Sequence, residues 1–298
     1  MSTATETAGA VAAPTLAVWK FASCDGCRPA LLDCRDELLA VAGRVRIDSV
    51  PEAAGGVAPG PYDLSLVEGS ITTPEDAARI RDVRARSRYL VVLGACGSSD
   101  GIQALRNYAD VADVADGAFQ GRVGAAYPSP LYLSTLKYSA PVRDHVKVDY
   151  ELRGCPVDRG QLLEVITAFL SGRSPAIPDR SVCHECEARG AACVTVTYGA
   201  PCLGPVTQAG CGAICPAFHR GCVGCVGSAR QARTEAMALL LLAEGCAPDR
   251  LLRTLMPANP ANPANPADPG HRAPGLAVAR TAADEAAGRE REEGRREP

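Results

Sequence analysis

Cysteine is the residue type whose number and spacing in this chain could do chemistry. Fourteen cysteines occur among 298 residues, and all but Cys34 and Cys246 fall into three sets of four. The first set is Cys24, Cys27, Cys96 and Cys155; the second set is Cys183, Cys186, Cys193 and Cys202; the third set is Cys211, Cys215, Cys222 and Cys225. Thiols in a reducing cytosol rarely persist as structural disulfides, so metal binding or redox chemistry is the expected role.

Each set has the composition of an iron-sulfur site. Four thiolates commonly hold one cluster, and a closely spaced pair lets one short segment supply two ligands. Such pairs, with two residues between the cysteines, are Cys24 and Cys27, Cys183 and Cys186, and Cys222 and Cys225. Proline follows Cys215, as it does at the end of ferredoxin-type ligand runs. We therefore predict that these cysteines bind iron as 4Fe-4S clusters.

Other readings of the cysteines remain open at this point. Zinc also favours four thiolates and paired cysteines, so zinc is the alternative for the second and third sets. For the first set the alternative is buried core cysteine. A thioredoxin-like redox pair at Cys24 and Cys27 would leave the other members of the sets unexplained. Cys34, within a predicted helix, and Cys246, near a helix end, are predicted to be structural.

Composition and motifs narrow the class of protein. The formal net charge is -3, without the basic face that a nucleic acid requires, and the hydrophobic content of 47% can supply a globular core. No export signal follows Met1, and the longest apolar helical run, residues 236–243, is too short to span a bilayer. We therefore expect a cytoplasmic protein. Neither a Gly-x-Gly-x-x-Gly segment after a strand nor a phosphate loop occurs, so the chain itself is not expected to bind NAD or ATP.

The elements that must position the first set alternate between strand and helix. Predicted strands are residues 16–23, 45–50, 62–67, 89–93 and 146–152, and predicted helices are residues 29–40, a segment that opens at Thr73, and residues 158–170. This order predicts an α/β fold, a flavodoxin-like doubly wound parallel sheet over residues 15–175. Every cysteine of the first set follows a predicted strand end, so the set should converge at the carboxyl edge of the sheet.

The composition changes after residue 175. The stretch from Cys183 to Cys225, within residues 176–256, contains the second and third sets, few aliphatic residues and many glycines and prolines. Such a segment cannot build an ordinary hydrophobic core, so we predict a small irregular iron-sulfur domain held by metal, with a packing helix over residues 228–243. Residues 1–14 are predicted to be a disordered lead-in, and residues 257–298, with their Ala-Asn-Pro repeats, a disordered tail.

These residues resemble the small subunit of nickel-iron hydrogenases, more narrowly the delta subunit of cytoplasmic sulfhydrogenase type. The matching segments, in family order over about residues 15–227, are residues 23–27 (SCDGC), 67–71 (VEGSI), 94–97 (GACG), 154–156 (GCP), 202–207 (CLGPVT) and 221–225 (GCVGC). Single segments are weakly specific. The six segments in this order are together highly specific for the family.

The resemblance implies a role for each set. The first set would hold a proximal 4Fe-4S cluster beside the active site of a separate large subunit, the third set a medial cluster and the second set a distal cluster. Periplasmic relatives usually have histidine where this chain has Cys183, and often proline where it has Cys215. Three all-cysteine clusters are therefore expected, and ligation by thiolates alone favours lower potentials. Glu68 would either assist a proton relay near the subunit interface or anchor a hydrogen bond.

By the same resemblance, the chain is an oxidoreductase subunit with no catalytic residue of its own. Hydrogen would be split at a nickel-iron centre in the large subunit, and electrons would pass through this chain to flavin (FAD) and iron-sulfur subunits that reduce NAD(P). Two alternatives are a hydrogen-sensing regulatory hydrogenase subunit and a zinc-stabilised interaction module without electron transfer.

Overall fold

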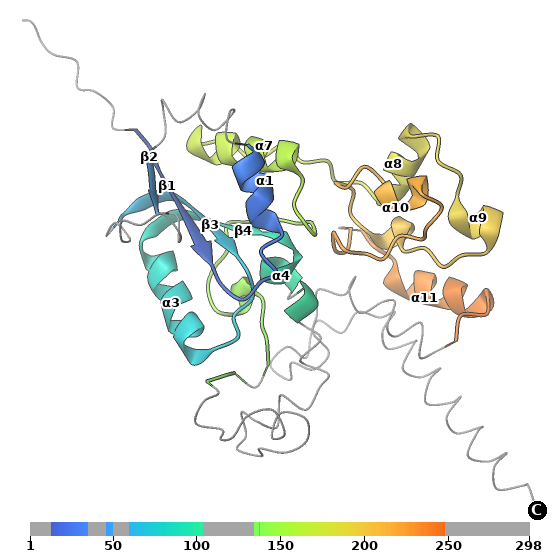
Figure 1. Ribbon diagram of the computed structural model, residues 1–298, viewed down its shortest axis with the longest axis horizontal. Coiled ribbons are helices and arrows are strands. Elements are labelled where there is room, and N and C mark those ends of the chain that lie inside the picture. Colours follow the sequence, from blue (N-terminus) through green and yellow to red (C-terminus); the bar gives the residue numbers. More distant parts are fainter. Residues whose placement is uncertain are drawn as a thin grey trace, which may run out of the picture.

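The computed structural model describes residues 13–34, 46–49, 60–99, 101–103, 134–136, 138–229 and 231–247, with the backbone alone for residues 46–49. Nearly all of the predicted lead-in and the whole predicted tail lie outside these residues. In Figure 1 the described elements form a sheet with helices, in blue to green, and a group of short helices in yellow and orange.

The first part of the chain forms one parallel sheet. Its strands are β1 (Thr15–Lys20), β2 (Arg46–Ser49), β3 (Tyr62–Glu68), β4 (Ser87–Leu93) and β5 (Tyr150–Leu152). Their order is β2-β1-β3-β4-β5, and every neighbouring pair is parallel. This is the flavodoxin order, so the predicted fold class is confirmed for the sheet.

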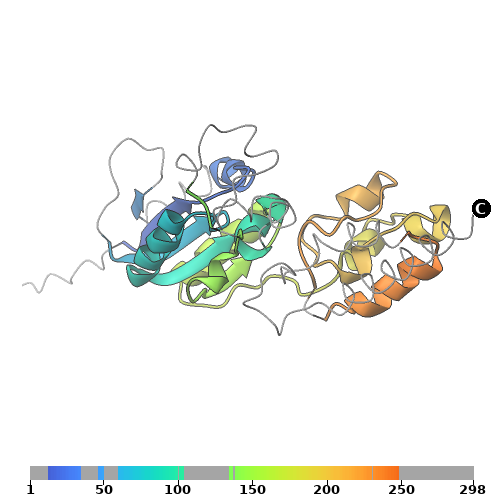
Figure 2. The same ribbon diagram turned by 90° about the horizontal axis from the view of Figure 1, so that it is seen from below.

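Helices cover both faces of the sheet because its strands are apolar on both sides. Leu16 and Val18 of β1 point to the face covered by α1 (Cys27–Asp33) and α7 (Arg159–Leu170). Ala17 and Trp19 alternate with them and point to the opposite face, where α3 (Pro74–Ala85) packs. Figure 1 shows the strands with α1 and α7 on one side and α3 on the other, and Figure 2 views the sheet from the side of α3. Strands buried on both faces need apolar residues at consecutive positions, as β1 has.

Two helices begin where the sequence predicts, because each has an N-cap side chain. The Thr73 hydroxyl accepts a hydrogen bond from the Asp76 amide at 3.0 Å, and proline follows at the first position of α3. The Asp158 carboxylate accepts the amide of Gln161 at 2.9 Å at the start of α7. Such caps satisfy amides that have no partner within the helix.

The structure corrects several predicted boundaries. Helix α1 already begins at Cys27, two residues before the predicted start, and its apolar residue Leu32 is 66% exposed. The predicted strand 146–152 pairs only from Tyr150, because the Val146 amide binds the Val142 carbonyl and closes a turn after the 3-10 helix η3 (Val142–Asp144). The helix predicted over residues 228–243 is α11 (Thr234–Ala243), which starts later. The Ala229 amide instead donates to the Val206 carbonyl at 2.9 Å, a contact that lies outside any helix.

The cysteine-rich part contains short helices and isolated bridges. Its elements are α8 (Val182–Ala188), α9 (Val194–Tyr198), the 3-10 helix η4 (Gly204–Val206), α10 (Ile214–Ala217) and α11. One small apolar cluster joins α11 to η4, and another includes Cys202 and Cys222 among its buried members. In this second cluster, cysteine side chains thus occupy buried positions that aliphatic side chains fill in an ordinary core. The division into domains at residues 175 and 256 remains a prediction.

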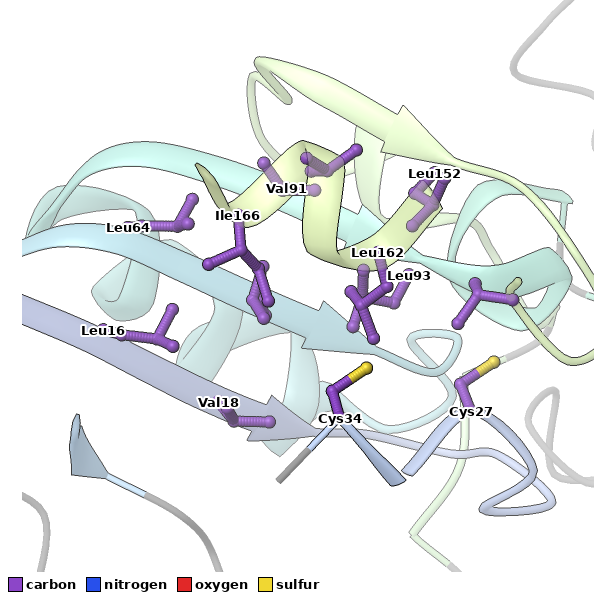
Figure 3. Packing of buried hydrophobic residues seen from close by; sticks show 13 residues of the cluster. Leu16, Val18, Cys27, Cys34, Leu64, Val91, Leu93, Leu152, Leu162 and Ile166 are labelled. Atoms are coloured by element: carbon purple, nitrogen blue, oxygen red, sulfur yellow. The ribbon is translucent and has the colours of Figure 1, made fainter. Parts of the chain in front are cut away.

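Cys34 lies in the apolar cluster between α1, α7 and the sheet. It is fully buried, and Figure 3 shows it beside aliphatic side chains, whereas Cys27 lies beyond the arrowheads of the strands. Its sulfur contacts the Ala30 carbonyl at 3.0 Å. The structural role predicted for Cys34 agrees with this position. No helix in the described ranges has the length and apolar character that crossing a bilayer requires.

Leu162 should be a main contributor to the stability of the sheet domain. It lies in α7 and is fully buried against the sheet, so Leu162→Ala is expected to lower the free energy of unfolding by about 2–5 kcal/mol through lost burial and a cavity. Urea unfolding followed by the fluorescence of Trp19, the single tryptophan, measures this. Leu32→Ala on exposed α1 is the control and should cost about 0.5 kcal/mol or less. Equal costs would contradict the assigned core.

Candidate metal centres

The first set lies in three loops at the carboxyl edge of the sheet. Cys24 and Cys27 follow β1, Cys96 lies in α4 (Gly94–Ser99) directly after β4, and Cys155 follows β5. The edge predicted from strand order is therefore where the structure places them. The segment that holds Cys96 is a short helix.

These loops contact one another closely. The Ala95 amide donates to the Gly154 carbonyl at 2.7 Å, which joins the Cys96 and Cys155 segments. A Cβ atom added at Gly94 would lie 2.4 Å from the Cys27 sulfur, so only glycine leaves room for that sulfur. Gly94 also has a φ of +76°, which an L side chain rarely adopts. The four thiols thus come from distant positions to one small region.

The pKa values of the first set reflect burial and the closeness of the thiols to one another. Burial raises the pKa of Cys27 to about 12 and that of Cys96 to about 11, and the Cys155 charge acts on both in the same direction. Burial and the Cys24 charge raise the pKa of Cys155. Thiols so placed ionise poorly by themselves, but a cationic metal centre reverses this balance and holds them as thiolates. The residues of the first set fit such a centre.

Glu68 supports this site from the end of β3. It is 3% exposed, its Oε1 accepts the Cys27 amide at 3.3 Å, and its Oε2 has no hydrogen-bond partner among the residues described. Burial raises the pKa of this carboxyl group. Of the two roles considered for Glu68, the hydrogen-bond anchor is the one for which the structure supplies a contact. The proton relay remains a prediction.

The second set surrounds Gly204. Cys183 and Cys186 are in α8, Cys193 precedes α9, and Cys202 precedes η4. A Cβ atom at Gly204 would lie 3.4 Å from the sulfurs of both Cys183 and Cys202. Burial raises the pKa of Cys186, and the charges of Cys183, Cys202 and Cys193 raise it further. The charges of the other three members of the set therefore all reach Cys186.

The third set lines a cavity of about 270 Å³. All four of its cysteines contribute to the wall, and Cys155 of the first set does so too. Burial raises the pKa of Cys225 to about 11, and the charges of Cys155, Cys211, Cys222 and Cys215 add to this effect. A cavity whose wall includes four thiols is suited to an inorganic cluster.

The third set has contacts with both other sets. Besides sharing the cavity wall with Cys155, it meets the second set where the Cys222 amide donates to the Cys202 sulfur at 3.2 Å. Arg153, two residues before Cys155, donates to the Ser228 carbonyl at 2.6 Å and joins the sheet to the segment after Cys225. The spatial order is therefore first, third, second, although the third set is last in sequence.

Sequence reasoning missed the polar groups that support the sulfurs. Thr207 contacts the Cys222 sulfur at 3.6 Å, and the Glu185 carboxylate lies 3.8 Å from the Cys211 sulfur. Glu185 stands between Cys183 and Cys186, but no spacing rule connects it to Cys211. Within the part of the chain with described placement, no group of three or more His, Cys, Asp or Glu residues is arranged for a single metal ion. Cys246, half-buried after α11, packs against the apolar cluster that joins α11 to η4.

Comparison with known proteins finds a matching family profile, hydrogenase subunits among the relatives, and a solved hydrogenase structure. The family profile described as "NADH ubiquinone oxidoreductase, 20 Kd subunit" matches residues 24–169. Sulfhydrogenase 2 subunit delta of Pyrococcus furiosus is 34% identical over 212 residues, 71% of this chain and 85% of the relative. One subunit of the F420-non-reducing hydrogenase vhu of Methanocaldococcus jannaschii is 30% identical over 233 residues, 70% of this chain and 80% of the relative. A chain in the solved structure of an NAD+-reducing [NiFe]-hydrogenase in the H2-reduced state is 30% identical, with a TM-score of 0.48 over 55% of this chain and 95% of that chain.

The space for the Cys27 sulfur depends on Gly94. Gly94→Ala is expected to cost about 2–4 kcal/mol of unfolding free energy, since the new Cβ meets that sulfur and the residue keeps a left-handed φ. Gly172→Ala is the matched control. Gly172 has a φ of +69° with nothing within 4 Å of its Cβ position, so its replacement should cost only about 1 kcal/mol. Urea unfolding measures both, and equal costs would contradict the steric role.

The crowded thiols should also react slowly when metal is absent. At pH 8 the ionised fraction is about 10⁻⁴ for a pKa of about 12 and about 10⁻³ for a pKa of about 11, and the thiolate is the form that reacts. In the reduced, metal-free chain, alkylation of Cys27 and Cys96 should therefore trail that of exposed Cys193 by at least about a hundredfold. Their rates should rise about tenfold per pH unit above pH 8. Iodoacetamide pulses read by mass spectrometry test this, and equal rates at pH 8 would refute it.

Proposed function

The chain belongs to the small subunits of nickel-iron hydrogenases, and on that premise we propose that it carries electrons on three 4Fe-4S clusters between the nickel-iron site of a large subunit and a nicotinamide-linked acceptor. As a small hydrogenase subunit it is an electron-transfer chain of an oxidoreductase with a large-subunit partner. The number of clusters, their ligands and the acceptor are our proposal.

The observation that carries the proposal is the contact of the third set with both other sets. The Cys155 charge raises the pKa of Cys225 across one cavity, and the Cys222 amide reaches the Cys202 sulfur. Electron transfer between clusters requires such short separations. We assign the first set to the proximal cluster, the third set to the medial cluster and the second set to the distal cluster.

The residues of this chain would act as ligands and as supports of ligands. The twelve thiolates would hold iron, and the bound clusters would supply one-electron transfer. Burial and hydrogen bonds at the sulfurs, such as those from the amides of Cys222 and Gly204 to Cys202, would set how readily each site accepts an electron.

The acceptor side of the proposal rests on ligand type. Thiolate-only ligation favours low potentials, which suit exchange with NAD(P) through FAD and iron-sulfur subunits. We place the complex in the cytoplasm, where thiols stay reduced until iron binds them. A hydrogen-sensing complex would share the clusters but turn over little NAD(P). Hydrogen-dependent NAD(P) reduction by the purified complex distinguishes the two.

Metal content tests the proposal directly. The complex purified without oxygen should be brown and contain about twelve irons in this chain, because three 4Fe-4S clusters need that number, with nickel in a co-purifying chain. Iron and nickel quantification of the separated chains measures this. A colourless chain loaded with zinc would end the proposal and favour the interaction module.

Removal of one ligand tests the role of the first set. Cys155→Ala should reduce the iron content of this chain by about four atoms and uncouple hydrogen oxidation from NAD(P) reduction, because a cubane needs its full set of thiolates. Cys246→Ser, which changes a cysteine outside the sets, is the control and should change neither. Coupled activity that survives Cys155→Ala unchanged would reject the assignment.

A further inference from the structure

Glu185 belongs to the helix of the second set but contacts the loop of the third set. It lies in α8, between Cys183 and Cys186. Its Oε1 accepts the Gly210 amide at 2.9 Å, its Oε2 accepts the Ala213 amide at 3.2 Å, and the same Oε2 lies 3.8 Å from the Cys211 sulfur. One carboxylate therefore spans the loop on both sides of Cys211.

The loop that Glu185 holds has a strained backbone. Gly210, Gly212 and Ala213 have φ values of +142°, +65° and +51°, and Ala213 is a fully buried residue with a side chain that disfavours this conformation. Arg189, one turn after Glu185, donates to the Gly212 carbonyl at 2.6 Å. Two side chains of the α8 segment thus bind the loop, one by accepting from amides and one by donating to a carbonyl. Figure 1 shows α8 beside α10, which follows this loop.

The strained loop directs amides at the Cys211 sulfur. Burial raises the pKa of Cys211, the amides of Ala213 and Ile214 lower it, and the Glu185 charge raises it again. By contrast, burial and neighbouring thiolates account for the raised pKa of Cys186. The Glu185 charge thus acts on Cys211, a member of the third set, although Glu185 lies in the helix of the second set. The Glu185 carboxylate also competes with the Cys211 sulfur for the hydrogen bond of the Ala213 amide.

We propose that Glu185 is a positioning residue that orients the Cys211 loop and lowers the reduction potential of the cluster on the third set. This inference rests on the proposed function, that the third set binds a 4Fe-4S cluster. Reduction adds one electron, and hence one negative charge, to the cluster. A fixed carboxylate beside one ligand sulfur disfavours that added charge and so favours the oxidised form. The carboxylate also accepts the Ala213 amide, which would otherwise donate to the Cys211 sulfur and stabilise the reduced form of the cluster.

Glu185→Gln in the complete complex, purified without oxygen, tests this. Glutamine keeps the length of the side chain and removes its charge. At a fixed potential the reduced-to-oxidised ratio of one cluster should rise about tenfold, a modest value because Glu185 is half-buried, which equals about 59 mV for a one-electron couple. Electron paramagnetic resonance during a reductive titration with dithionite measures the ratio. The shifted signal should be the one that Cys211→Ala abolishes.

Glu187→Gln is the matched control. Glu187 lies in the same helix, carries the same charge and is exposed, so its loss should leave every cluster signal within about twofold of the unaltered complex. Full iron content with unshifted signals in Glu185→Gln would overturn the inference, as would an equal shift of all clusters. An unaltered chain without iron would instead overturn the proposed function.

Arg189→Gln covers the case in which the Glu185 variant fails to retain iron. Arg189 binds the same loop with the opposite charge, so its loss should lower the reduced-to-oxidised ratio of the same cluster. The change should be about twofold to threefold, because Arg189 is exposed and screened by solvent. An unchanged ratio, or a change in another cluster, would overturn the inference.

Discussion

The structure depends on thiols that are buried close together. Burial and neighbouring sulfurs together keep the pKa of Cys27, Cys96 and Cys225 far above the ordinary thiol range. The carboxylates of Glu68 and Glu185 lie beside two of these sets, and their negative charges raise the pKa of Cys27 and of Cys211 further. A cationic iron-sulfur core would turn this unfavourable arrangement into a ligand shell.

The two parts of the chain meet that constraint in different ways. In the first part, the sheet supplies its own stability from apolar residues on both faces, so the loops at its carboxyl edge can present cysteines on a prepared scaffold. The second part has small apolar clusters that include cysteines themselves. Its stability is therefore expected to depend on what the cysteines bind, as in other small metal-held domains.

Contacts at the sulfurs differ from set to set, and this gives each site a separate means of adjustment. The Cys27 loop is tied to a buried carboxylate, Cys202 accepts two backbone amides, and Cys211 lies in a strained loop bound by side chains of a different set. Hydrogen bonding and charge at ligand sulfurs tune cluster potentials. Under the proposed function, twelve identical side chains would thus produce sites that differ in their affinity for electrons.

The sequence by itself determined the parallel sheet and the grouping of its cysteines at one edge, because consecutive apolar residues, N-caps and strand ends are local signals. It also placed Cys34 in the core. Only the tertiary structure decided the start of the last helix, the exposure of Leu32 and the contact of the third set with both other sets. The role of Glu185 likewise required the fold, since its partners are more than twenty residues away along the chain. Spacing reports which residues are neighbours in the chain, whereas long-range packing sets which charges meet in space.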